Sequence, residues 1–64
     1  MSLHEYRESI CIERQDYSFY ALVMAAMRKA DSGNAVKLRE AWPAVWAELQ
    51  ARYNAPDGLL KGEA

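Results

Sequence analysis

The run from Phe19 to Met27 most constrains how this chain can fold, because its nine residues include no polar side chain except the hydroxyl of Tyr20. A helix with one apolar stripe can rest on a single surface, whereas a helix that is apolar on nearly every side must be covered on more than one side. A chain of 64 residues offers little material for that cover, since a domain of this size buries only roughly 60% of the surface that its unfolded chain exposes. We therefore expect a partner, either another copy of the chain or a different protein.

The sequence lacks the covalent and metal-based supports that small domains often use. Cys11 is the only cysteine and His4 the only histidine, so the chain cannot form an internal disulfide or supply the four ligands of a structural zinc site. We expect Cys11 to be a small buried apolar side chain and His4 an exposed one near a mobile chain end. We expect no metal and no cofactor, which leaves oligomerisation or binding as the support.

Charge and hydropathy argue against several classes of protein. The net charge of −1 lacks the basic excess that is typical of dedicated nucleic-acid or membrane-surface proteins. No apolar run approaches the roughly 18 to 20 residues that span a bilayer, and the first residues lack a signal-peptide pattern. With a free thiol besides, we expect a cytoplasmic protein with no membrane partner.

Residues 1–15 permit two structures. Ser2 and Glu5 have the spacing of a helical capping box, and Leu3, Tyr6 and Ile10 then share one helical face. The apolar, β-branched residues around Cys11 also suit a short strand. We favour a short helix.

A helix is predicted over residues 16–31. Asp16 is placed to cap its first amides, and Arg28 and Lys29 suit the negative end of its dipole. Gly33 is predicted to end this helix in the left-handed conformation, and Asn34 or Asp31 to cap the next one.

The segment 34–53 is predicted to be helical, with a kink near Pro43. Proline disfavours helix at the preceding residue and costs about 3 kcal/mol in a helix interior. Nevertheless, one helical spacing of apolar residues continues through it, at Leu38, Trp42, Val45/Trp46, Leu49 and Tyr53. We expect one kinked helix or two helices nearly in line. Residues 54–64 are predicted to be a turn at 54–58 and a loose tail over 61–64, with Leu59 and Leu60 close to the core.

These elements predict an all-α fold, a helical hairpin or small three-helix bundle in one domain of residues 1–64. The short connection makes 17–30 antiparallel to 35–53, with the N-terminal segment as an incomplete third helix. The outer side of the central helix, with Leu22, Met24 and Ala25, should remain poorly covered.

The sequence contains no recognisable catalytic pattern. It has no Gly-rich phosphate loop, no HExxH, and no serine in a nucleophile elbow. Asp16 is better explained as a helix cap than as a catalytic acid. We expect that the protein is not an enzyme.

Large apolar and aromatic residues are the best candidates for function, because tryptophan and tyrosine dominate interface energetics. The predicted partner-binding residues are Tyr20, Leu22, Met24, Met27, Trp42, Trp46 and Tyr53. They predict a protein-interaction module that forms a homodimer or binds another protein. The alternative is a nucleic-acid-binding regulator that uses basic residues near the Gly33 turn, namely Arg28, Lys29, Lys37 and Arg39.

One resemblance rests on two segments, the run Phe19–Asp31 and the later Trp46-x-Glu-Leu-x-x-Arg-Tyr-x-Ala-Pro56. Together they resemble small uncharacterised helical proteins encoded by phages, prophages and mobile elements. The resemblance carries no functional motif and implies only a context, in which small proteins act by binding as regulators, inhibitors of host machinery or assembly factors.

Overall fold

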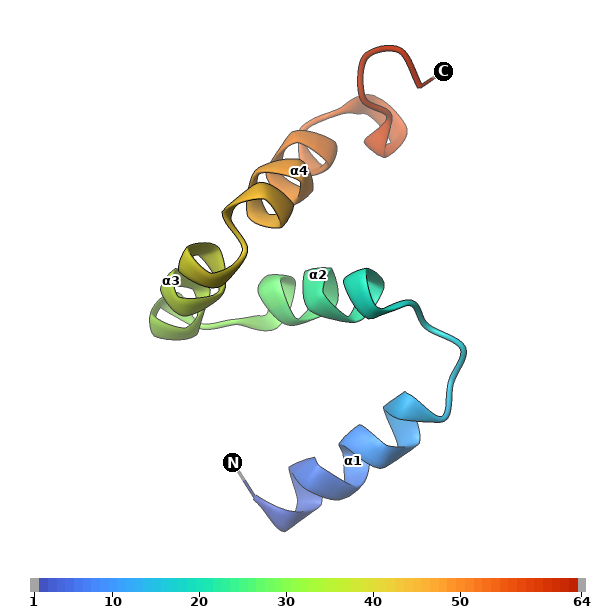
Figure 1. The fold of residues 1–64 in the computed structure, drawn as a ribbon, viewed down its shortest axis with the longest axis vertical. Coiled ribbons are helices and arrows are strands. Elements are labelled where there is room, and N and C mark those ends of the chain that lie inside the picture. The colour runs from blue at the N-terminus through green and yellow to red at the C-terminus, as the bar shows by residue number, and fades with distance from the viewer. Residues whose placement is uncertain (1, 64) are drawn as a thin grey trace.

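The computed structural model describes residues 2–63, which form four α-helices and one 3₁₀ turn. The α-helices are α1 (Leu3–Glu13), α2 (Phe19–Lys29), α3 (Ser32–Ala41) and α4 (Pro43–Tyr53), and the turn η1 covers Pro56–Gly58 (Figure 1). The described residues contain no strand, so the all-α prediction is confirmed. The ambiguous segment around Cys11 is helical.

The helix starts show which polar residues act as caps. The Ser2 hydroxyl accepts a hydrogen bond from the Glu5 amide at 3.1 Å, as the capping spacing predicts. Asp16 does not cap α2. Ser18 has the extended backbone of a cap and accepts from the Ala21 amide at 3.2 Å. Serine and aspartate are similarly good caps. Ser18 caps α2 because it directly precedes the first helical residue, Phe19.

The α2–α3 turn differs from the prediction at Gly33. This glycine lies inside α3, and the described glycines with positive φ are Gly58 and Gly62. The chain leaves α2 because Ala30 adopts an extended backbone, with φ −69° and ψ 139°. Asp31 then caps α3, with its Oδ1 accepting from the Asn34 amide at 2.8 Å. Of the two predicted caps, Asp31 has this role.

Pro43 divides the predicted segment 34–53 into two helices. Trp42 takes a non-helical backbone, with φ −134° and ψ 67°, and Pro43 occupies the first turn of α4. The proline ring disfavours the helical region at the residue before it, while its missing N–H is tolerated at a helix start. In Figure 1, α3 and α4 follow one another along one diagonal. The alternative of two successive helices is therefore the one observed.

A small core joins α2 to α4. Its buried residues are Val23, Met27 and Leu49, and Met24, Leu38, Val45 and Trp46 pack against them. The chain reverses between α2 and α3, so that α4 returns to contact α2 (Figure 1). Tyr53 departs from the predicted apolar face, because its side chain is 76% exposed.

The helices lie in a thin, extended arrangement. The molecule is elongated and measures 43 × 28 × 16 Å. Its radius of gyration is 13.7 Å, against about 11 Å for a compact domain of this length. No residue of α1 is buried. The fold is therefore extended, with broad uncovered faces.

Candidate protein-binding surface

Half of the large apolar side chains of the described residues are exposed. The core contains three buried residues, whereas ten large hydrophobic residues are exposed: Leu3, Tyr6, Ile12, Tyr17, Phe19, Tyr20, Val36, Trp42, Tyr53 and Leu59. Single exposed apolar residues are normal, but contiguous patches of them mark interaction sites. Two such patches occur at α2.

The first patch is a groove along α2, named here the α2 groove. Its volume is about 570 Å³, and it is lined by Ile12, Tyr17, Ala21, Leu22, Ala25, Ala26 and Lys29. Successive helical residues point about 100° apart, which places Ala25 opposite Val23 and Met27, with Leu22 and Lys29 beside it and Met24 on the other flank. Helix α2 thus has two apolar faces, one covered by α4 and one open. The prediction that Leu22 and Ala25 lie on a poorly covered side is confirmed.

The second patch is an aromatic cluster formed by Phe19, Tyr20 and Trp42. The Phe19 ring lies 5.2 Å from the Tyr20 ring and 6.2 Å from the Trp42 ring, at interplanar angles of 69° and 66°. Aromatic pairs favour such edge-to-face geometry. The cluster joins the start of α2 to the α3–α4 junction, and all three side chains are exposed.

The structure separates the seven residues predicted to bind a partner. Leu22 lines the α2 groove, and Tyr20 and Trp42 belong to the aromatic cluster. Met27 is only 4% exposed, which is too little for a contact residue, and its assignment to the partner surface is wrong.

Met24 and Trp46 pack against the core instead of facing outward. The prediction that Met24 lies on the uncovered side of the helix is therefore wrong. It lies one helical residue from Val23, on the side of α2 that α4 covers. Tyr53 is exposed at the end of α4, away from both patches.

Besides the alanines at 21, 25 and 26, two larger residues of the α2 groove were not predicted as site residues. Ile12 comes from the last turn of α1, and Tyr17 from the connection to α2. Their place depends on how α1 folds back beside α2, and no local spacing in the sequence encodes that. Tyr17 could only be recognised as part of an excess of aromatic bulk.

The four basic residues of the nucleic-acid alternative are all exposed. Lys29 lines the α2 groove, whereas Arg28 lines a separate hollow with Trp46 and Tyr53. Lys37 and Arg39 lie on α3. Arg28 and Lys29 therefore contribute to different surfaces, although they are adjacent in the sequence.

Cys11 and His4 both lie on the surface of α1. The prediction that Cys11 is buried is wrong, because no other helix covers α1. The His4 side chain is exposed as predicted, and its Nε2 lies 3.5 Å from a Glu8 carboxylate oxygen. Among residues 2–63, no group of three or more potential metal ligands comes together.

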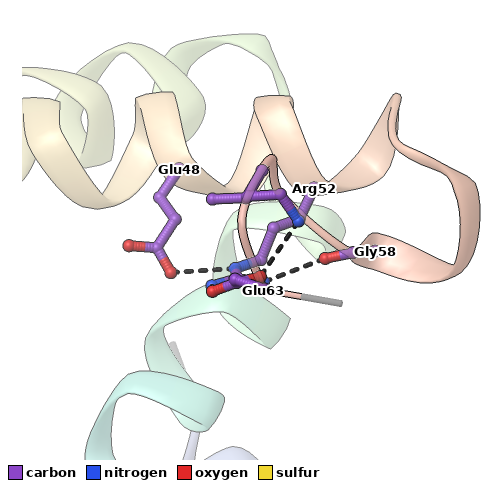
Figure 2. Close-up of polar contacts among 5 residues, drawn as sticks. Glu48, Arg52, Gly58 and Glu63 are labelled. Carbon is purple, nitrogen blue, oxygen red and sulfur yellow. Dashed lines mark hydrogen bonds and ion pairs between the residues drawn. The ribbon is translucent and has the colours of Figure 1, made fainter.

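A polar cluster around Arg52 holds the C-terminal residues against α4 (Figure 2). Arg52 donates from Nη1 and Nη2 to the two Glu63 carboxylate oxygens at 2.8 and 2.7 Å, and from Nε to Glu48 at 2.9 Å. It also donates to the Gly58 carbonyl. The chain turns back towards Arg52 through positive φ angles at Asp57 and Gly58. The predicted turn is present, but the prediction of a loose tail is wrong up to Glu63; Ala64 lies outside the described residues.

The Arg52 cluster predicts a pH dependence. Hydrogen bonds from Arg52 and from the Leu60 amide lower the pKa of Glu63 from 4.5 to about 2, and the two glutamates raise the pKa of Arg52. Because the pKa of Glu63 is lower in the folded state, its stabilising effect is complete above about pH 4.5 and is lost as the pH falls towards 2. We expect the carboxyl carbon of Glu63 to titrate near pH 2 by NMR.

An Arg52→Gln variant is the control for this titration. It removes the two Arg52 donors, which are the largest cause of the low pKa of Glu63, and leaves the Leu60 amide. The titration midpoint should therefore rise towards the ordinary glutamate value of about 4.3. An ordinary midpoint in the unmodified chain would show that Arg52 does not hold the tail in solution.

Within residues 2–63, no helix has the length and apolar character needed to cross a membrane. Comparisons of the chain with protein-family models, curated proteins and solved structures found no match. The assignment of function therefore depends on the surfaces described above.

Proposed function

We propose that this chain is a small protein-interaction module that acts by binding protein through the open face of α2. The observation that carries the proposal is the second apolar face of α2, with the α2 groove opposite the core. Domains are generally built from two packed layers of secondary structure. In this chain the open face of α2 has no second layer packed on it, and a protein partner would supply that layer.

The exposed area of the chain supports the same proposal. A compact protein of 7.3 kDa exposes about 4,200 Å², whereas this chain exposes 5590 Å². The excess of about 1,400 Å² is larger than the roughly 800 Å² that each partner buries in a standard interface. The chain can therefore form such an interface and still expose as much surface as a compact protein of its size.

The cellular context of the proposal comes from the sequence. An exposed, free Cys11 suits a reducing cytoplasm. The resemblance to small phage and mobile-element proteins remains a prediction, and regulators or inhibitors of that kind act by binding. Nucleic-acid binding also remains a prediction, and the separation of Arg28 from Lys29 does not favour it.

The test is the solution mass, measured by light scattering during size exclusion over a hundredfold range of protein concentration. We expect a dimer or larger assembly at high concentration, because the open face of α2 needs a cover. We also expect the thermal unfolding midpoint to rise with concentration, since association with the folded state stabilises it. A monomer that unfolds cooperatively at one temperature over the whole range would contradict self-association. The proposal would then require a foreign partner.

A further inference from the structure

We propose that the α2 groove is filled by α2 of a second copy, antiparallel to the first about a two-fold axis near Ala25. This inference rests on the proposed function and specifies its partner. A two-fold interface uses the same patch on both chains, so a single contact covers both open grooves. Three features of the groove favour this occupant over a foreign protein.

The first feature is the shape of the groove floor. It is formed by Ala21, Ala25 and Ala26, while the larger Ile12, Tyr17 and Leu22 also line the groove. Small side chains let two helix axes approach within the usual 8–10 Å. Helix α2 has 11 residues and is therefore about 16 Å long. The open face of α2 in a second copy has the same length and the same small residues at its centre, so it fits this groove.

The second feature is the charge pattern along the groove. Lys29 lines it at the C-terminal end of α2. Near the other end, the exposed segment of Glu13, Arg14 and Asp16, with a net charge of −1, adjoins the lining residues Ile12 and Tyr17. In an antiparallel pair about Ala25, Lys29 of each copy lies opposite Ala21 of the other, on the half of α2 that is nearer Glu13 and Asp16, whereas a parallel pair would bring like charges together. The groove is thus complementary to itself in the antiparallel direction only.

The third feature is the area that each copy has to bury. Every copy carries the same excess of about 1,400 Å² over a compact protein of its mass. A symmetric dimer that buries roughly 800 Å² from each chain removes more than half of that excess from both chains in one association. A foreign partner would need an unsatisfied face of its own with the same length and charge order.

Disulfide trapping tests the position of the axis. Facing Cα atoms of helices 8–10 Å apart lie about 3–5 Å from each other, since each Cα lies about 2.3 Å from its axis. A disulfide needs about 4.4–6.8 Å. We expect an Ala25→Cys variant in a Cys11→Ser background to form a covalent dimer under mild oxidation. Cysteine is small, so circular dichroism should remain unchanged.

Ala51→Cys in the same background is the matched control. Ala51 is an exposed alanine on α4 that does not line the α2 groove, and this variant should remain mostly unlinked. Equal linking of both variants, or no linking of Ala25→Cys while the unmodified chain is dimeric, would overturn the antiparallel pairing. The proposed function would then stand, with assembly through another face. A chain that is monomeric at every concentration would overturn the pairing itself.

Charge reversal tests the direction of the pair. Lys29→Glu and Asp16→Lys should each raise the dimer Kd about fivefold. Each variant replaces an attractive charge pair at the rim of the interface with a repulsive one, in both symmetry-related contacts. The double variant should return to within about twofold of the unmodified chain, because the pairs form again with opposite signs. Additive weakening in the double variant would exclude contact between these two residues across the interface.

Discussion

Replacing Leu49 by alanine is expected to remove a large part of the stability of the free chain. Leu49 is one of three buried residues, and it is the α4 residue that packs between Val23 and Met27 of α2 and the rest of the core. Removing a buried leucine side chain costs about 2–5 kcal/mol. A chain of 64 residues has a total stability of about 3–10 kcal/mol by its length. The loss should appear as a large fall in the thermal unfolding midpoint, followed by helical circular dichroism.

Leu59→Ala is the matched control for Leu49→Ala. Leu59 carries the same side chain on the same half of the chain, but it is 46% exposed. Its replacement should cost less than about 1.5 kcal/mol, since little apolar area returns to water. Equal losses for the two variants would mean that the α2–α4 core does not determine the stability of the chain.

Much of the helical order could be predicted from local sequence. The caps at Ser2 and Asp31 and the break before Pro43 depend on atoms within four residues, so the sequence determines them directly. Leu38, Val45 and Leu49 keep their predicted face because the apolar spacing continues from α3 into α4 through the break. Such features do not require knowledge of how distant segments meet.

The predictions were wrong where two neighbouring residues could each cap or end a helix, and where residues distant in the sequence come into contact. Asp16 and Ser18 are both good caps, and only the position of the first helical turn selects Ser18. Gly33 can end a helix, but a glycine is also tolerated in the first turn of one that Asp31 caps. The pairing of Arg52 with Glu63 spans 11 residues, and it depends on a chain reversal whose geometry the turn residues alone do not specify.

The candidate site was predictable only where it depends on local sequence. An all-apolar helix must have two apolar faces, so the open face with Leu22 and Ala25 could be predicted from Phe19–Met27 alone. The choice of face for Met24 and Met27 could not, because it depends on which side α4 covers. The contribution of Ile12 required the three-dimensional position of α1.

Replacing Leu22 by glutamate is expected to abolish the assembly and preserve the helices. Leu22 lines the open α2 groove beside Ala25 and is not part of the core. In the free chain, a charge there remains in contact with water and costs little. In the assembly, the same charge is buried without a partner, and the leucine contact is lost. Together these effects cost at least about 3 kcal/mol, which corresponds to a rise in Kd of at least about a hundredfold.

Met24→Glu distinguishes this effect from general destabilisation. Met24 lies on the same helix two residues away and is half-buried like Leu22, but it packs against Val23, Met27 and Leu49. Its replacement places a charge at the core, so the helical circular dichroism should fall at every concentration. Leu22→Glu should instead give a helical monomer by light scattering.

If both variants lose their helices equally as monomers, Leu22 belongs to the core and the open face of α2 is not an interface. If Leu22→Glu remains a dimer, the chains associate through another surface, for which the aromatic cluster of Phe19, Tyr20 and Trp42 is the next to be substituted.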